Sequence, residues 1–145
     1  MVKKECNIHE SVKIIEPVNL YGCELKDNVF VGPFVEIQSD VLIDSNTRVQ
    51  SHSFICSGVS IGSNCFIGHG VMFTNDTFSN SKVNFDGPLK KTIISDNVII
   101  GSNSTILPVS ICSGVIIGAG SVVTKDISLP GKYVGNPAKR LSDED

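Results

Sequence analysis

Apolar residues, nearly all of them aliphatic, recur at every sixth position along most of the chain. We call them the repeat residues: one run comprises Leu25, Val31, Ile37, Ile43, Val49, Ile55, Ile61, Ile67 and Phe73, and another comprises Ile94, Ile100 and Ile106. A smaller or β-branched residue often follows four positions later, so both side chains point to one face of an extended strand. Because one such unit cannot bury its apolar side alone, this short fixed period predicts strand-and-turn units that stack.

The repeat extends back to Ile8 and on to Val123, which gives 18 six-residue units. At three units per coil we expect a parallel β-helix of about six coils, standing roughly 29 Å tall at about 4.8 Å per coil. An antiparallel sandwich would need hairpin signals at wider spacing, and an α-helix would need apolar residues three and four positions apart. We therefore predict that residues 1–145 form a single all-β domain.

One long insert interrupts the repeat, the excursion loop 74–93. Loops of this length in a compact domain are usually functional or disordered. This one carries four apolar side chains that can anchor it: Phe78, Val83, Phe85 and Leu89. We therefore expect an ordered arm that packs on a neighbouring subunit. Residues 130–145 form a C-terminal tail.

Composition and charge narrow the possible functions. The chain is 41% hydrophobic and 19% charged, and its net charge of −3 argues against a nucleic-acid partner. It has no apolar run of 18 or more residues, so we predict no membrane span. The first residues lack the apolar stretch of a signal peptide, and the five cysteines form no close Cys-x-x-Cys pair. We therefore expect a cytoplasmic protein with reduced packing thiols.

Stacking also predicts which polar side chains become neighbours, because residues 18 apart occupy adjacent coils. His52 and His69 avoid the inward positions, and we expect them on one face with Cα atoms about 5–7 Å apart. Asn75 and Asp76 follow round the next corner, and Gln38 lies about two coils lower. We expect all five residues along one edge of the β-helix.

Three later segments resemble the hexapeptide-repeat acyltransferases: Ile100–Pro108, Ile117–Asp126 and the Gly-Asn-Pro-Ala-Lys stretch Gly135–Lys139. The resemblance covers nearly the whole chain. It implies a left-handed winding of three-sided coils and a homotrimer. It also implies that acyl-CoA lies in the groove between neighbouring β-helices.

A narrower resemblance is to the nucleotide-sugar N-acetyltransferases, carried by residues 28–38, 50–55 and 66–76. It implies transfer of an acetyl group from acetyl-CoA to the 3-amino group of a UDP- or dTDP-linked amino sugar, used in bacterial surface polysaccharide. That family often has a Pro-Arg pair soon after Asn-Asp, where this chain has Thr77-Phe78-Ser79-Asn80. The identities of the nucleotide and the sugar therefore stay open.

An amine that attacks a thioester must be unprotonated and held near the carbonyl carbon, and the developing oxyanion needs donors. Asn75 and Asp76 are candidates to orient the amine, and His69 is the candidate general base. Gln38 and His52 are candidates for binding the sugar. Proton transfer to the departing thiolate is the alternative to a histidine base.

The resemblance places coenzyme A on the C-terminal coils. The backbones of Ala119 and Gly120 would contact the pantetheine arm, and Lys125, Lys139 and Arg140 would meet the phosphates or the adenine. The Gly101 N–H is a candidate oxyanion donor. Residues 125–140 hold four basic residues against one acidic residue, which suits a phosphate-rich cofactor.

Three other functions fit a β-helix. A sugar or serine O-acetyltransferase would act on a hydroxyl group, and a scaffold would have no catalytic site. A carbonic anhydrase of this fold would need three histidines on zinc, two of them closely spaced. His9, His52 and His69 are too dispersed for that, so we predict no metal site.

Overall fold

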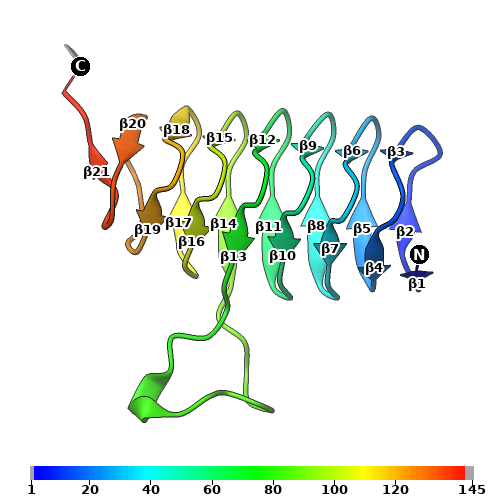
Figure 1. Cartoon of the computed structure of the whole chain (residues 1–145), viewed down its shortest axis with the longest axis horizontal. Helices are drawn as coiled ribbons and strands as arrows, with labels where there is room; N and C mark the ends of the chain where they lie inside the picture. Colours follow the sequence, from blue (N-terminus) through cyan, green and yellow to red (C-terminus); the bar gives the residue numbers. More distant parts are fainter. Residues whose placement is uncertain (1, 143–145) are drawn as a thin grey trace.

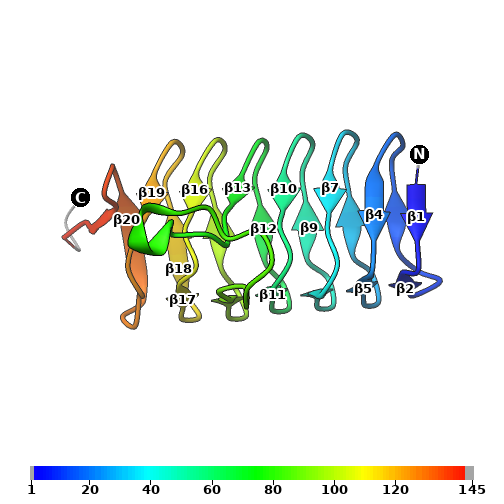
Figure 2. The ribbon, with the colours of Figure 1, turned by 90° about the horizontal axis from the view of Figure 1, so that it is seen from below.

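The computed structural model describes residues 2–142. It is a left-handed parallel β-helix, with its two ends at opposite ends of a straight stack of coils (Figure 1). Seen from below, the coils follow one another in chain order (Figure 2). The predicted all-β fold is therefore confirmed. No helix among the described residues is both long and apolar enough to cross a membrane.

Within residues 2–142 the strands form three sheets of seven, six and eight strands. Sheet A contains β1 (Val2–Lys4), β4 (Asn19–Tyr21), β7 (Glu36–Ile37), β10 (Phe54–Ile55), β13 (Met72–Phe73), β16 (Thr105–Ile106) and β19 (Val122–Val123). Sheet B contains β2 (Asn7–Ile8), β5 (Cys23–Leu25), β8 (Val41–Ile43), β11 (Val59–Ile61), β14 (Thr92–Ile94) and β17 (Ser110–Ile111). Sheet C contains β3 (Lys13–Ile14), β6 (Phe30–Val31), β9 (Arg48–Val49), β12 (Phe66–Ile67), β15 (Ile99–Ile100), β18 (Val115–Ile117), β20 (Gly131–Val134) and β21 (Lys139–Arg140).

The stack has about seven turns, one more than the repeat predicted. The extra strands are β1, which pairs with β4, and β20, which pairs with β18. Both lie outside the run of repeat residues, so counting those residues could not find them. β21 then pairs antiparallel with β20 and breaks the parallel pattern at the C-terminal end. Residues 143–145 of the predicted tail lie outside the described part of the chain.

The repeat residues fill the core, because their side chains point to the inside of every coil. Twelve of the largest side chains are almost completely buried: Phe73, Leu20, Leu25, Ile37, Ile43, Ile55, Ile61, Ile67, Ile94, Ile100, Ile106 and Ile111. The smaller inward position holds residues such as Val35, Cys65 and Val98, which are also buried. Parallel backbone hydrogen bonds link each coil to the next, as between Glu36 and Ser53.

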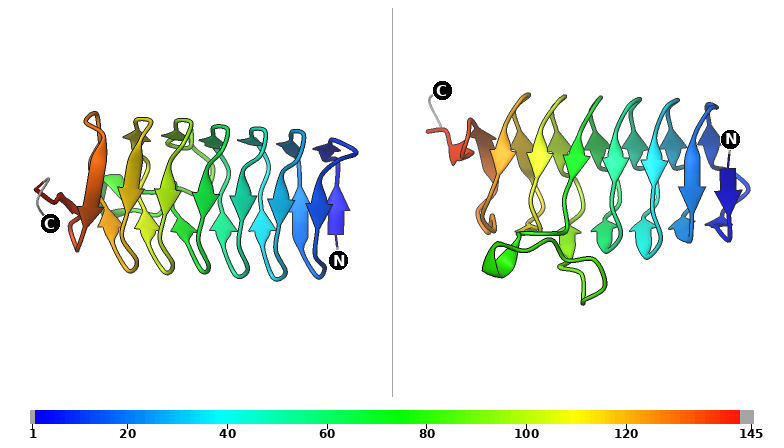
Figure 3. Two further views of the ribbon diagram at one scale, coloured as in Figure 1. Left: turned by 90° about the horizontal axis from the view of Figure 1, so that it is seen from above. Right: turned by 60° about the horizontal axis from the view of Figure 1, so that its bottom comes forward.

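The strand register shows how the insert is accommodated. Before it, Phe54 pairs with Met72, 18 positions on, whereas across it Ile61 pairs with Ile94, 33 positions on. β14 therefore takes the next place in sheet B, and no unit of the repeat is skipped. Because β14 begins at Thr92, the arm consists of residues 74–91, including the 3₁₀ turn η1 (Ser79–Ser81). It projects from the corner between sheets A and B (Figures 1 and 3).

Two neighbouring isoleucines of β14 give a matched test of this core. Ile94 is 2% exposed and Ile93 is 51% exposed. We expect Ile94→Ala to lower the free energy of unfolding by about 2–5 kcal/mol, because it leaves a cavity between coils. Ile93→Ala should change it by about 0.5 kcal/mol or less. Denaturant unfolding measures both values, and equal losses would contradict the inward register.

Candidate functional site

The polar residues singled out from the sequence lie at two corners of the β-helix. His52 and His69 occupy the turns that lead from sheet C into sheet A, just before β10 and β13. Gln38, Asn75 and Asp76 follow β7 and β13, where the chain turns from sheet A towards sheet B. The six positions from His69 to Asn75 span at most about 20 Å. We expected one shared edge, but the width of sheet A separates the two groups.

The first of these, the histidine corner (His52 and His69), is a ladder of stacked turns. The Gly70 N–H donates to the Ser51 carbonyl oxygen at 3.0 Å, which sets the turn of His69 above the turn of His52. Both imidazoles are exposed, so neither histidine belongs to the core. The His52 ring packs against Phe34 of the coil below, with ring centroids 5.0 Å apart.

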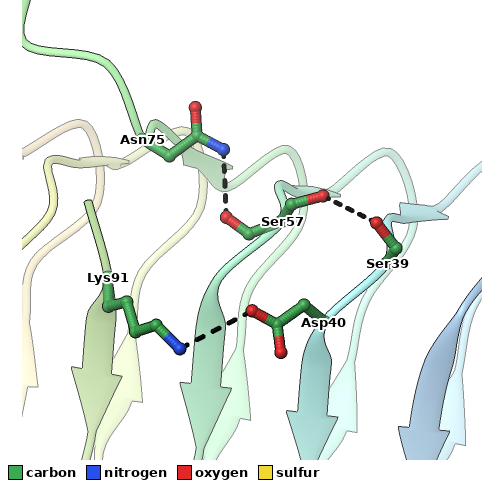
Figure 4. Close-up of polar contacts among 5 residues, drawn as sticks. All are labelled: Ser39, Asp40, Ser57, Asn75 and Lys91. Carbon is green, nitrogen blue, oxygen red and sulfur yellow. Dashed lines mark hydrogen bonds and ion pairs between the residues drawn. The ribbon is translucent and has the colours of Figure 1, made fainter. Parts of the chain in front are cut away.

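The second group, the Asn75 corner (Gln38, Asn75 and Asp76), rests on a column of serines. Asn75 Nδ2 donates to the Ser57 carbonyl oxygen at 2.9 Å, and Ser57 Oγ lies 3.2 Å from Ser39 Oγ (Figure 4). Asn75 Oδ1 points away from Ser57, and within residues 2–142 it has no hydrogen-bond partner. That oxygen can accept a hydrogen bond from a bound molecule. An ion pair between Lys91 and Asp40 at 3.6 Å lies beside the column (Figure 4).

Gln38 is held at both ends of its amide. Its Nε2 donates to Glu36 Oε2 at 3.0 Å, and its Oε1 accepts the Ser57 N–H at 3.2 Å. The amide therefore already has partners within the protein, which fix its orientation at the Asn75 corner.

The Asp76 carboxylate closes the base of the arm. Its Oδ2 accepts the Asn84 N–H at 2.7 Å, and its Oδ1 accepts the Phe78 N–H at 2.8 Å. These backbone hydrogen bonds, that of Asn84 first, lower the pKa of Asp76 because they favour the charged form. A carboxylate with a lowered pKa is a weaker proton acceptor. The geometry therefore favours a positioning role for Asp76 over proton abstraction.

Further polar contacts order the arm. Asn84 Oδ1 accepts the Gly87 N–H at 2.8 Å, and Asn84 Nδ2 donates to the Pro88 carbonyl oxygen at 3.1 Å. The Lys90 ammonium donates to the Thr77 hydroxyl across the two ends of the arm. Phe85, near its tip, is 90% exposed. The arm is thus an ordered loop, and its packing on a neighbouring subunit stays a prediction.

A cavity of about 480 Å³ lies on sheet A beside the Asn75 corner. Its lining residues are Gln38, Phe54, Cys56, Phe73, Thr74, Asn75, Asp76, Thr77, Phe78 and Leu107. Burial raises the pKa of the Cys56 thiol to about 11, so this side chain is neutral at pH 7. The cavity therefore has a polar rim beside Asn75 and an apolar interior.

The residues assigned to coenzyme A do not form one site within a single chain. Gly101, Ala119 and Gly120 belong to the same stack of turns as His69, because the Asn103 N–H donates to the His69 carbonyl oxygen and the Gly120 N–H donates to the Ser102 carbonyl oxygen, both at 2.8 Å. The Gly101 N–H already donates to the Ile117 carbonyl oxygen at 2.7 Å, so the expectation that it is an oxyanion donor is wrong. Lys125 and Lys139 line a separate cavity of about 240 Å³. Arg140 lies in β21, where its Nε donates to the Pro130 carbonyl oxygen at 3.0 Å.

The sequence analysis did not predict the lining of the cavity of about 480 Å³ beside the Asn75 corner, although the repeat indicated part of it. Cys56, Thr74 and Leu107 each follow a repeat residue of sheet A, as Gln38 does. Stacking the units places these positions in one column. Nothing in the sequence indicated that Phe78 lines this cavity, because the arm has no repeat.

Comparison with known proteins gives the family. The family described as "GMPPB C-terminal domain" matches residues 37–143. The chain belongs to this family. Among curated relatives, the bifunctional protein GlmU of Thermodesulfovibrio yellowstonii is 56% identical over 46 residues, covering 30% of this chain and 10% of GlmU. GlmU of Streptococcus gordonii is 45% identical over 65 residues, covering 43% and 14%. The matched segments thus span about a tenth of these relatives.

Solved structures with the same architecture are acyltransferases. The polySia specific acetyltransferase NeuO aligns over 97% of this family member and 77% of its own chain, with 26% identity and a TM-score of 0.63. The N-acyltransferase AntD from Bacillus cereus, in complex with dTDP-4-amino-4,6-dideoxyglucose and coenzyme A, aligns over 94% and 82%, with 22% identity and a TM-score of 0.53. These neighbours support the resemblance to hexapeptide-repeat acetyltransferases.

The contacts of Asp76 predict how the arm responds to mutation and pH. Asp76→Ala should speed hydrogen exchange of the Phe78 and Asn84 amides at least tenfold, because both lose their acceptor. In the unmodified chain the protection should persist at neutral pH and be lost as pH falls below 3.8, the ordinary value, because the folded-state pKa is lowered. Exchange measured by mass spectrometry reports both effects. Asp86→Ala in the same arm is the control, and equal exchange in both variants would contradict the assignment.

Proposed function

We propose that this chain is an acetyltransferase that moves an acetyl group from acetyl-CoA to the amino group, at C3, of a UDP- or dTDP-linked amino sugar. The observation that carries the proposal is the alignment of 97% of the chain with the acetyltransferase NeuO. The nucleotide-linked amino sugar and coenzyme A in the AntD complex agree with these substrates. We further propose a cytoplasmic homotrimer acting in bacterial surface polysaccharide synthesis.

Asn75 is the residue best placed to meet the amine. Its Nδ2 is fixed by the coil below, which leaves Oδ1 to accept an N–H of the amino group. That hydrogen bond directs the nitrogen lone pair at the thioester carbonyl carbon. The new C–N bond forms as the C–S bond breaks. The amine proton passes to the His69 imidazole, or to the coenzyme A thiolate in the mechanism without a base.

A second copy of the chain brings the two corners together in this proposal. A cyclic trimer uses heterologous interfaces, in which one surface of a subunit meets a different surface of the next. The histidine corner of one copy then faces the Asn75 corner of its neighbour. Gly101, Ala119 and Gly120 lie in the stack of turns at the histidine corner. The seam between copies would therefore also hold the thioester, with Lys125, Lys139 and Arg140 near the phosphates.

A scaffold without catalytic activity is the alternative from a different class. The comparisons favour this alternative in one respect. The family is described as a C-terminal domain, and the match to the bifunctional protein GlmU covers only 10% of that protein. Acetyl-CoA binding separates the two proposals. Calorimetry with acetyl-CoA should give saturable binding, and its absence would favour the scaffold. Hydroxyl-bearing acceptors assayed in parallel distinguish O-acetylation.

The role of Asn75 predicts a selective loss of activity. Asn75→Ala should lower turnover of the amino sugar by at least about tenfold, because the amine loses its orienting acceptor. The fold should persist, since only the Ser57 contact is lost within the protein. A thiol-release assay with acetyl-CoA measures turnover. Asn7→Ala in β2, far along the stack, is the matched control. Full activity of Asn75→Ala would remove this residue from the site.

Mixed assemblies test whether two copies share the site. Asn75→Ala and His69→Ala chains, each of low activity alone, should recover about a quarter of normal activity when assembled together in equal amounts. The reason is that about a quarter of heterologous interfaces would pair an intact Asn75 corner with an intact histidine corner. Differently tagged chains and the thiol-release assay measure this recovery. When both parents have lost activity, no gain over either parent would mean that the two corners do not meet.

A further inference from the structure

Two cysteines lie directly above one another at the N-terminal end of the stack. Asn7 of β2 pairs with Glu24 of β5, so the residues that precede them, Cys6 and Cys23, share one register position. The Cys23 thiol donates to Cys6 Sγ at 3.4 Å, and the Cys6 thiol donates to the Lys4 carbonyl oxygen at 3.4 Å. The two sulfur atoms are therefore in contact while both cysteines are free thiols.

The packing of the β-helix does not require this pair. In the next two coils the same inward position of sheet B holds Val41 and Val59, so a small apolar side chain is enough there. The other three cysteines are Cys56, Cys65 and Cys112, and within residues 2–142 none of them has a hydrogen bond to a second thiol. The stacked thiols are thus a local feature of the first two coils.

The pair needs little movement to form a disulfide. Neighbouring coils lie about 4.8 Å apart, which falls within the Cα separation of about 4.4–6.8 Å that a disulfide spans. The sulfur atoms have to close the remaining gap from 3.4 Å to bonding distance. Only the first coil has to shift, because in the described chain β2 is the end strand of sheet B and pairs with β5 alone (Figure 1).

The two thiols differ in exposure, which sets the order in which they react. Cys23 is 3% exposed, and burial, with the hydrogen bond to Cys6 next, raises the pKa of its thiol to about 12. Since the thiolate is the reactive form, Cys23 is a poor first nucleophile. Cys6 is only half-buried. A cavity of about 530 Å³ on sheet B reaches the pair, with Glu5, Asn7 and Cys23 in its lining. A small oxidant therefore meets Cys6 first.

We propose that Cys6 and Cys23 form a modification site at which a hydroperoxide produces a disulfide between the first two coils. Cys6 Sγ attacks the hydroperoxide and the O–O bond breaks, which leaves a sulfenic acid on Cys6 and releases water or an alcohol. Cys23 Sγ then attacks Cys6 Sγ, the S–O bond breaks, and the Cys23 thiol proton leaves with the hydroxyl group as water. The two thiols lose two electrons, which the hydroperoxide accepts. This inference does not depend on the proposed function.

Peptide mapping of the oxidised protein is the direct test. Hydrogen peroxide is added to the full chain until half of Cys112 is oxidised, and the protein is then denatured, alkylated and mapped by mass spectrometry. Cys112 is the internal control, because it is half-buried as Cys6 is and, among the described residues, has no thiol beside it. We expect a Cys6–Cys23 disulfide within single chains, which dithiothreitol reduces, and no disulfide that includes Cys112.

Three results of this mapping would overturn the inference. The first is that Cys6 and Cys23 are both recovered as free thiols. The second is that Cys6 is oxidised to a sulfinic acid while Cys23 stays a free thiol. The third is that Cys6 is linked to a different chain or to another cysteine.

A valine variant tests the role of Cys23 without disturbing the core. Cys23→Val places in the second coil the residue that Val41 and Val59 already supply in the next two. Without the second thiol, trapping of the Cys6 sulfenic acid by dimedone should rise at least about fivefold over the unmodified chain. Cys65→Val, at another buried inward position, is the matched control and should leave the disulfide unchanged. Equal trapping in both variants would contradict the role of Cys23.

Hydrogen exchange tests whether the disulfide ties the first coil to the second. The His9 N–H donates to the Leu25 carbonyl oxygen at 3.0 Å, and the Gly22 N–H donates to the Lys4 carbonyl oxygen at 2.8 Å. Both amides therefore exchange when the two coils separate. A cross-link over 17 positions restricts that opening, so oxidation should slow the exchange of both amides at least about tenfold. Unchanged exchange in the oxidised protein would show that the disulfide does not hold the coil in place.

Discussion

The vertical register of the coils is the constraint on which the structure depends. Inward repeat residues such as Ile37, Ile55 and Phe73 stack on one another, and a parallel ladder of backbone hydrogen bonds ties each coil to the next. Neither interaction tolerates a slip by one residue, because a slip would turn the apolar side chains outward. The register therefore decides which polar residues share a column, as with Ser39, Ser57 and Asn75.

Much of the fold could be predicted because its period is short and its core uniform. The repeat located the inward residues and the single interruption, but it undercounted the coils. β1 and β20 have no repeat residue in the predicted run and join the stack through backbone pairing with β4 and β18. The register of Ile61 with Ile94 shows that the insert replaces no unit of the repeat.

The single edge expected for the candidate site was wrong because six positions make one full unit of the repeat, and one unit crosses the whole width of a sheet. His69 and Asn75 are only six positions apart, yet β13 lies between them. The contacts of Asp76 were beyond prediction for a different reason. Its partners, Phe78 and Asn84, belong to the aperiodic arm, whose course depends on tertiary contacts. Predicting the apolar wall of the cavity would require both the stacked positions of the coils and the path of the arm.

The position of the arm also explains how the wall of a cavity can vary on a rigid stack. A corner is the one place where residues can be added without disturbing the ladder, and β14 keeps its pairing with β11 after the arm returns. Loop-closure cost rises slowly with length, so an arm of this size adds little penalty beyond that of a shorter loop. The arm brings Phe78 to a cavity whose other walls belong to the core. Changes in the arm can therefore reshape the cavity while the coils keep the Asn75 corner in place. Under the proposed function, this would separate the part of the chain that holds the reacting groups from the part that selects among acceptors.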